Sequence, residues 1–216
     1  MVCDKMASMN IERASHAMAA IKNSFIYVAG GCNSKGELSS CEEYNIETNK
    51  WQEIASLNEK KRWISLTDHS NCLYAFGGMA DKALSTIERL NSSGTKTWTI
   101  IKLSAGSELW KSRFFTCAIS FSSTSIMLFG GIVDGSESRE CLLFNTTDNS
   151  LTKAAELLKV DAFYLARPGF AGDKMLIVGD CEEDLHIFEK SKSKWTLMSK
   201  TIWNPEYSLE WKSGTF

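Results

Sequence analysis

The side chains able to ligate a metal or to act as acids and bases are few and scattered along this sequence of 216 residues. The three histidines, His16, His69 and His186, are isolated from one another, so they do not form the clustered ligand set of a zinc site. No metalloprotease H-E-x-x-H, phosphate loop, G-x-S-x-G elbow or dinucleotide fingerprint is present. We therefore expect no catalytic residue, no metal and no cofactor.

Cysteine usage and charge narrow the class of protein further. The seven cysteines are an odd number and include no C-x-x-C pair, which indicates reduced, packed thiols. The first ten residues, MVCDKMASMN, lack the apolar core of a secretory signal, and no stretch has the length of a membrane span. Lys and Arg number 24 against 26 Asp and Glu, so neither nucleic acid nor a membrane surface is an expected partner. We expect a cytoplasmic protein.

Cations and indoles gather in three segments, NIER, LNEKKRW and ELWKSRF. Guanidinium and indole groups are common anchors of protein interfaces. The candidate partner-binding residues are Arg13, Lys61, Arg62, Trp63, Trp110, Lys111 and Arg113. An acidic peptide would suit them. The alternative is structural, with the arginines paired with Glu12, Glu59 or Glu108 or with neighbouring backbone carbonyls.

The elements that would position these residues belong to a repeat. The segments FIYVAGG, CLYAFGG and SIMLFGG end on the glycine pairs Gly30-Gly31, Gly77-Gly78 and Gly130-Gly131, and MLIVGD ends a weaker fourth copy on Gly179. The first glycines recur after 47, 53 and 49 residues, a spacing typical of propellers and repeat arrays. A second landmark, Trp51, Trp98, Leu151 and Trp195, follows the glycines, and a large apolar residue such as Tyr44 precedes it by seven or eight positions.

Each repeat is interpreted as four short strands. The first is an apolar run (HAMAAI, WISLTD, FFTCAI, FYLA), the second ends on the glycines, the third carries Tyr44 or its equivalent, and the fourth starts at the tryptophan. Turn signals arrive too often for helices, and Asn45, Asn91 and Asn145 open polar hairpin turns. A lone sheet with two apolar faces cannot cover itself, so successive sheets should pack face to face around an axis.

The double glycine, the Tyr and Trp pair and the arginine before the first strand together resemble the kelch repeat. The resemblance extends over about residues 9 to 198, with repeats at about 9–57, 58–104, 109–157 and 158–198 and a tail at 199–216. It departs from the family at Leu90, Phe144, Leu151 and the Gly179-Asp180 pair. The resemblance implies an all-β propeller of four recognisable blades, in which Cβ atoms at the glycines would clash and Tyr44 and the tryptophans pack between blades.

The number of blades leaves two alternatives, a compact ring of four or part of a larger propeller, and we favour the second. The parallel between KMASMNIER and QEIASLNEKKR suggests that Met1 to Met9 form the last strand of a blade. Tail aromatics such as Trp203 and Trp211 are expected to pack against the propeller.

The resemblance implies a non-enzymatic protein-binding module, such as a substrate adaptor of a ubiquitin ligase or a scaffold. In kelch proteins the interblade links and the loops after the glycines gather at one face, where partners bind. Here they would place Arg13, Arg62 and Arg113 at one opening of the central channel. The alternatives are an actin-type cytoskeletal binding protein and, ranked lowest, a metal-dependent oxidase, for which Tyr27, Tyr74 and the scattered histidines are the sole ligand candidates.

Overall fold

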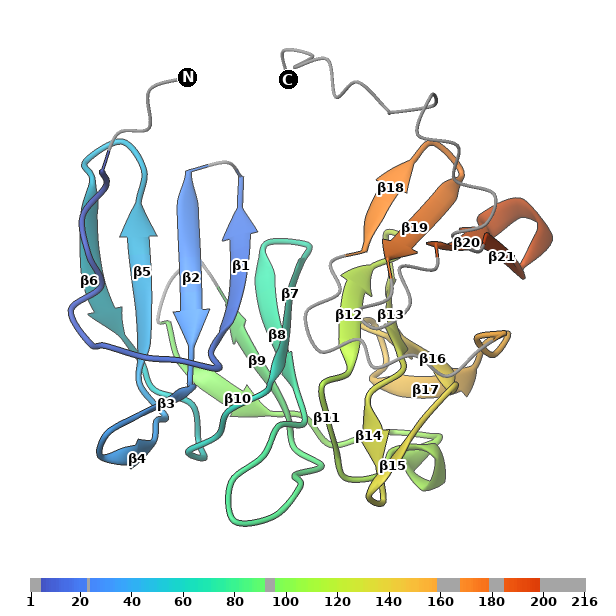
Figure 1. Ribbon diagram of the computed structural model, residues 1–216, viewed down its shortest axis with the longest axis horizontal. Coiled ribbons are helices and arrows are strands. Elements are labelled where there is room, and N and C mark those ends of the chain that lie inside the picture. Colours follow the sequence, from blue (N-terminus) through green and yellow to red (C-terminus); the bar gives the residue numbers. More distant parts are fainter. Residues whose placement is uncertain (1–4, 23, 92–95, 159–167, 179–184, 199–216) are drawn as a thin grey trace.

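The computed structural model describes residues 5–22, 24–91, 96–158, 168–178 and 185–198. Its strands form four four-stranded antiparallel sheets that follow one another along the chain, together with two smaller sheets. Figure 1 shows the four large sheets as successive blades of an arc, from blue through green and yellow to orange. The predicted all-β propeller architecture with four blades is confirmed.

The strands of each blade neighbour one another in sequence order. Blade 1 contains β1 (Ala17–Ile21), β2 (Phe25–Ala29), β5 (Cys41–Asn45) and β6 (Lys50–Ile54), and blade 2 contains β7 (Ser65–His69), β8 (Cys72–Phe76), β9 (Ile87–Asn91) and β10 (Trp98–Ile100). Blade 3 contains β12 (Cys117–Ser120), β13 (Ser125–Phe129), β16 (Cys141–Asn145) and β17 (Ser150–Lys153), and blade 4 contains β18 (Gly169–Ala171), β19 (Lys174–Val178), β20 (Leu185–Glu189) and β21 (Lys194–Met198).

Smaller strands lie in the loops after the glycines. The hairpin β3 (Cys32–Asn33) and β4 (Gly36–Glu37) follows β2, while β14 (Ile132–Val133) and β15 (Ser136–Glu137) follow β13 and pair with β11 (Arg113–Phe114). The helical elements of the described residues are two 3-10 turns, η1 (Ser107–Leu109) and η2 (Lys190–Lys192). No helix in this described part of the chain is long and apolar enough to cross a membrane.

The glycine pairs that end β2 and β8 lie where the link to the next blade approaches them closely. Gly30 and Gly77 have φ values of 61° and 59°, a left-handed conformation that favours glycine. A Cβ on Gly30 would lie 2.4 Å from the carbonyl oxygen of Lys61, and one on Gly77 would lie 2.2 Å from that of Arg113. Both carbonyls belong to the link that leads into the following blade. No side chain fits in this space.

The recurring tryptophans fix the outer strands. Trp51 lies opposite Tyr44, and Trp98 lies opposite Leu90, so the second landmark forms cross-strand pairs with the third strand. The indole nitrogen of Trp98 donates a hydrogen bond to the Ala55 carbonyl at 3.1 Å, where the preceding blade ends. These contacts tie each outer strand to the preceding interblade link.

The N-terminal segment lies beside blade 1 at the position that the interblade link occupies beside blade 2. Trp51 donates its indole hydrogen bond to the Ala7 carbonyl at 2.9 Å, as Trp98 does to Ala55. The amide of Asn10 donates to Glu42, as the amide of Asn58 donates to Glu88. Residues 5–11 therefore contact blade 1 in the same way as the end of blade 1 contacts blade 2. This arrangement agrees with the sequence parallel between KMASMNIER and QEIASLNEKKR.

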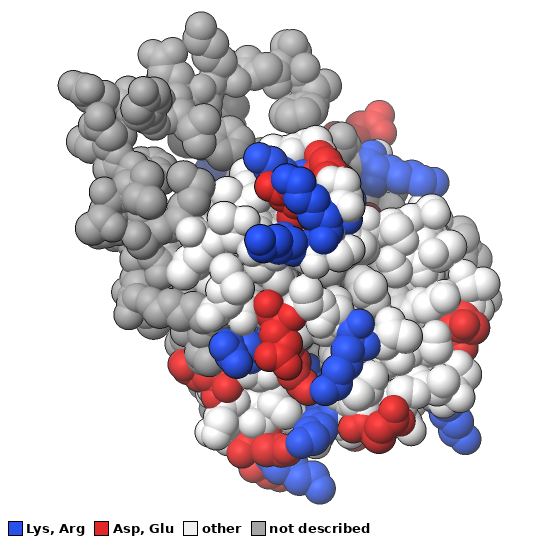
Figure 2. Space-filling view, turned by 90° about the vertical axis from the view of Figure 1, so that its right-hand side faces the viewer, with Lys and Arg blue, Asp and Glu red and all other residues white. Residues whose placement is uncertain are grey.

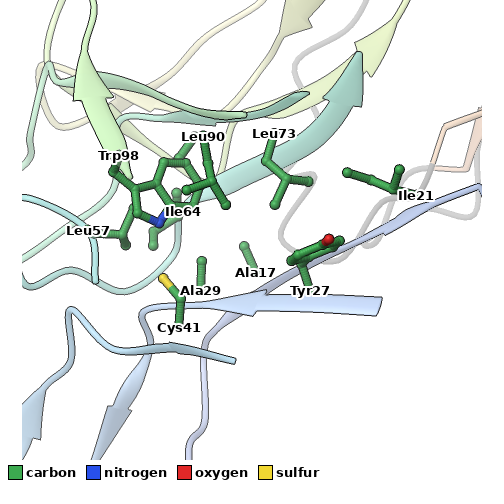
Figure 3. Close-up of a cluster of buried hydrophobic side chains, with 11 residues drawn as sticks. Ala17, Ile21, Tyr27, Ala29, Cys41, Leu57, Ile64, Leu73, Leu90 and Trp98 are labelled. Atoms are coloured by element: carbon green, nitrogen blue, oxygen red, sulfur yellow. The ribbon is translucent and has the colours of Figure 1, made fainter. Parts of the chain in front are cut away.

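Three hydrophobic clusters hold consecutive blades together. One joins blades 1 and 2 through residues such as Tyr27, Leu73 and Trp98, and Figure 3 shows their side chains converging between two facing sheets. A second joins blades 2 and 3 around Phe76 and Phe144, and a third joins blades 3 and 4. Among the described residues, no such cluster joins blade 4 back to blade 1.

The fourth repeat is described in part. Its first strand is Gly169–Ala171, which lies after the predicted strand FYLA, and residues 163–166 of that run are outside the described residues. Gly179 and the tail at 199–216 are also outside them. Trp195 lies opposite Phe188 and donates its indole hydrogen bond to the Ala155 carbonyl at 2.8 Å, so the tryptophan landmark is retained.

Candidate protein-interaction face

The inner strands of blades 1 to 3 begin at one end of the molecule with a shared backbone feature. Ser15, Trp63 and Phe115 have φ values of 54°, 53° and 56°, a conformation that is rare for bulky residues because the Cβ crowds the backbone. The amide of Trp63 donates to the Ser15 carbonyl at 3.0 Å, and the amide of Phe115 donates to the Trp63 carbonyl at 3.3 Å. We call these three residues the mouth.

Aromatic rings cluster at the mouth. The Trp63 ring lies 4.7 Å from the Phe115 ring and 5.6 Å from the Phe114 ring, centroid to centroid. The guanidinium of Arg62 lies over the Trp63 ring at 4.3 Å and also pairs with Glu37 at 3.6 Å. About a third of the Arg62 side chain is exposed, so this group combines an accessible cation with partly buried aromatic surface.

A pocket of about 690 Å³ opens between the three inner strands. Its walls come from residues 15–19, 63–68 and 115–119, with Pro168 at one side. The mouth residues form one end of this pocket. Along β7 the pocket wall extends as far as Asp68. The pocket corresponds to the space that the inner strands of a propeller surround.

Two of the predicted partner-binding cations are enclosed within ion pairs. Arg13 donates to the carbonyls of Gly30 and Ser40 at 2.7 and 2.9 Å and pairs with Glu42 at 2.9 Å. Lys61 pairs with Glu88 at 2.6 Å. All four of these charged side chains are completely buried, so neither cation faces solvent. Each instead connects the link before a blade to the third strand of that blade.

The cation before blade 3 is enclosed in a similar way. Arg113 pairs with Glu140 at 3.2 Å and donates to the Leu109 and Lys111 carbonyls at 3.2 Å each. Its guanidinium lies 4.5 Å from the Trp110 ring. Burial lowers the pKa of Arg113, and the charge of Glu140 opposes this shift. Arg113 has no exposed surface and Trp110 is 8% exposed, so both act within the fold.

One detail of the predicted arrangement is wrong. Arg13, Arg62 and Arg113 were expected to hold equivalent positions, but Lys61 is the equivalent of Arg13 and Arg113. The residue that follows each of them, Ala14, Arg62 or Phe114, pairs with the residue after a glycine pair. Arg62 is therefore shifted by one position along the link, and this shift places its side chain at the surface instead of in the buried ion pair.

The predicted partner-binding residues thus divide into two groups. Arg13, Lys61, Trp110 and Arg113 lie inside the fold, as the structural alternative anticipated for the arginines. Arg62, Trp63 and Lys111 retain exposed surface, and Lys111 pairs with Asp134 at 3.0 Å with both side chains more than half exposed. Three residues of the predicted set therefore have side chains at the surface, and the other four do not.

The histidines lie apart in the structure as they do in the sequence. His69 is buried and shares a 2.8 Å hydrogen bond with the Ser120 hydroxyl, while buried His186 lies beside Trp195. His16 lines the pocket, and burial together with the nearby Arg13 charge lowers its pKa. Within the described residues, no three His, Cys, Asp or Glu side chains converge as a metal site.

The described cysteines, which are residues 32, 41, 72, 117 and 141, are free thiols. Burial raises the pKa of Cys41 to about 11 and that of Cys141 to about 12. A thiol with so high a pKa is protonated at neutral pH and is a poor nucleophile. These two residues therefore pack as small apolar side chains in the cores between blades.

Sequence reasoning missed the acidic partners of the buried cations. Glu42 and Glu88 occupy the same position of the third strand in blades 1 and 2, and this recurrence in EEYN and IERLN was the available signal. Leu142 takes that position in blade 3, so Arg113 turns to Glu140. The aromatic pair beside Trp63 was also missed, because Phe114 and Phe115 were interpreted as part of the first strand.

Comparisons with known proteins agree with this architecture. Residues 12–58, which span the first blade and its preceding link, match the family model of the Kelch motif. The chain is 31% identical over 94 residues to Kelch-like protein 41a of Danio rerio, covering 44% of this chain and 16% of that protein. It is 37% identical over 89 residues to Kelch-like protein 9 of Mus musculus, covering 38% of this chain and 14% of that protein.

A third relative is an F-box/kelch-repeat protein of Arabidopsis thaliana, 34% identical over 74 residues, covering 34% of this chain and 16% of that protein. The matches thus span 14–16% of the length of these relatives. Four successive four-stranded sheets joined by hydrophobic clusters, with two glycine pairs in close contact with the link to the next blade, define a repeat protein of the propeller class. Within that class, residues 12–58 match the Kelch motif, and the chain is similar to kelch-like proteins over 38–44% of its length.

Proposed function

We propose that this kelch propeller is a non-enzymatic, cytoplasmic protein-binding module whose mouth and surrounding loops contact a partner protein. The observation that carries the proposal is the group formed by Arg62, Trp63 and Phe115, in which a partly exposed cation lies over the Trp63 ring and that ring packs against Phe115. Aromatic and arginine side chains dominate the energetics of protein interfaces. The buried ion pairs beneath this group hold the links that position it.

The proposed role is substrate recognition within a larger scaffold, such as a ubiquitin ligase adaptor. The similarity to kelch-like proteins and to an F-box/kelch-repeat protein supports this role. An acidic segment of the partner would compete with Glu37 for Arg62 and with Asp134 for Lys111. Elsewhere charges of both signs alternate, as Figure 2 shows for the face at the right-hand side of Figure 1, so charge recognition must be local.

The test is a pull-down from cytosolic extract with the immobilised chain, quantified by mass spectrometry. We expect a reproducible set of captured proteins that is lost with Trp63→Ala and reduced with Arg62→Glu. Lys50→Glu, an exposed charge reversal on the outer strand of blade 1, is the matched control and should retain capture. Capture unaffected by both Trp63→Ala and Arg62→Glu would exclude this surface as the interface.

A further inference from the structure

A lysine side chain of blade 2 ends on a buried carboxylate of blade 1. Lys96 lies two residues before Trp98, the first residue of β10, and its Nζ atom lies 2.5 Å from a carboxylate oxygen of Glu43 on β5. The Lys96 side chain is 28% exposed, whereas that of Glu43 is 4% exposed. The ammonium group therefore enters the contact between blades 1 and 2 from the surface.

Two aromatic rings of blade 1 lie beside the same ammonium group. The Nζ atom of Lys96 is 5.8 Å from the ring centroid of Phe25 and 5.9 Å from that of Tyr27. Both rings belong to β2 and are two positions apart, so they lie on one face of the sheet. Figure 3 shows Tyr27 on the side of blade 1 that faces blade 2. Aromatic rings attract ammonium groups, so the rings and the carboxylate together suit an alkylammonium ligand.

The carboxylate of Glu43 is also held by other residues of blade 1. The side-chain amide of Gln52 donates a hydrogen bond to it at 3.3 Å, and the Tyr27 hydroxyl forms a further hydrogen bond with it. Burial and this hydrogen bond raise the pKa of Tyr27, so its hydroxyl keeps the proton that it donates. These contacts do not depend on Lys96. A buried carboxylate without a cation is costly, so loss of the Lys96 contact would favour another cation at this place.

The Lys96 contact differs from the two buried ion pairs of the interblade links. The side chains of Arg13 and Glu42, and those of Lys61 and Glu88, have no exposed surface. Their cations cannot be exchanged for a ligand without opening the fold. Lys96 reaches its carboxylate from the surface, so its place can be taken by another group that enters along the same path.

We propose that Phe25, Tyr27 and Glu43 form a binding site for an alkylammonium group, the end of a lysine side chain of another protein, and that Lys96 is the resident cation that closes this site. Displacement of Lys96 opens it. The inference goes beyond the proposed function, because Phe25 pairs with Ile21 at the end of β1, whereas the mouth lies before the beginning of that strand.

The experiment is an NMR titration of isotope-labelled Lys96→Ala with n-propylammonium chloride, which replaces the three carbons and the nitrogen that the substitution removes. Neutral n-propanol is the matched ligand. We expect propylammonium to shift the amide signals of Phe25, Tyr27 and Glu43. Wild-type protein and Lys96→Arg should bind it at least about tenfold more weakly, because their own cation occupies the site. Lys102→Ala removes an exposed lysine elsewhere and should behave as the wild type.

The double variant Lys96→Ala/Glu43→Gln tests the carboxylate. It should bind propylammonium about tenfold more weakly than Lys96→Ala, the effect of losing one charge-assisted hydrogen bond. Thermal unfolding shows whether each variant keeps the fold, and Lys96→Gln, which retains more of the side chain, replaces Lys96→Ala if that variant does not fold.

Three results would overturn the proposal. They are the absence of shifts at these amides in the folded Lys96 variant, equal binding of propanol, and equal affinity of the wild type and Lys96→Ala for propylammonium. Unchanged affinity in the double variant would also overturn it, because the carboxylate would then have no part in binding. The pull-down with Trp63→Ala reports on the mouth separately, so each proposal can fail without the other.

Discussion

The amide of Gly31 donates a 2.9 Å hydrogen bond to the carbonyl of Lys61, whose own side chain is buried against Glu88. This contact joins the end of the second strand of blade 1 to the link that enters blade 2. Gly78 and Arg113 repeat it between blades 2 and 3. The glycine pairs and the buried cations therefore belong to the same contact between consecutive blades. Substitution of either group is expected to weaken that contact.

Gly77→Ala is expected to destabilise the fold by about 3 kcal/mol or more, because the new Cβ would meet the Arg113 carbonyl at 2.2 Å in addition to the strain of a positive φ. Gly172→Ala is the matched control, since Gly172 has the same φ of 59° and no atom within 4 Å of the added Cβ. It should cost about 1 kcal/mol. Urea unfolding at 25 °C measures both free energies, and equal values would contradict the close-approach explanation.

Lys61→Met is expected to lower the free energy of unfolding by about 3–5 kcal/mol, because it leaves the Glu88 carboxylate buried without its cation. The neighbouring Lys60→Met changes an exposed side chain and should stay within about 0.5 kcal/mol of the wild type. Adding Glu88→Gln to Lys61→Met should restore part of the lost stability. Additive effects in this double-mutant cycle would show that the two side chains are not coupled.

The blades could be predicted from the sequence because their signals are local and recur. Each glycine pair lies at a strand end, and each tryptophan lies opposite an apolar residue seven or eight positions earlier, so spacing alone identifies both elements. The reason for the first glycine, a clash with a neighbouring segment, was also expected. The partner atom, such as the Lys61 carbonyl, depends on how the next blade packs and was not predictable.

Whether each cation is buried or exposed could not be predicted from the sequence, because this depends on a register difference of one residue. In the run EKKR, Lys61 turns inward and Arg62 outward, although both are long cations next to one another. Their acidic partners are not the adjacent Glu59 but Glu88 and Glu37, which other strands supply. The ion-pair partners are not sequence neighbours, since Glu88 lies 27 residues after Lys61 and Glu37 lies 25 residues before Arg62.

Arg113→Glu and Arg62→Glu are expected to behave differently although both reverse an arginine before an inner strand. Arg113→Glu places a carboxylate beside Glu140 in a buried site, so the variant should be strongly destabilised, by about 4 kcal/mol or more. Arg62→Glu should change stability by less than about 1 kcal/mol, since its ion pair is partly exposed. Thermal unfolding followed by circular dichroism distinguishes them, and a stable Arg113→Glu protein would show that this site opens to solvent.

Stability should fall in alkaline solution because of the buried thiols. The pKa of Cys41 is about 11 and that of Cys141 about 12 in the folded chain, whereas an unfolded cysteine has a pKa of about 8.5. Between these values the folded state retains a proton that the unfolded state releases. The stabilisation is therefore complete below about pH 8.5 and is lost as the pH rises toward the folded pKa values, with a slope of at most about 1.4 kcal/mol per pH unit for each thiol.

Urea unfolding of the wild type and of the Cys41→Ala/Cys141→Ala variant at pH 7, 9 and 10.5, about the range of these pKa values, measures this loss. The variant starts with lower stability because methyl groups fill the thiol sites incompletely, but its free energy of unfolding should decline less steeply with pH. Tyr27, whose pKa burial also raises, contributes the decline that remains in both proteins. Parallel pH curves for the two proteins would mean that neither thiol titrates differently on folding.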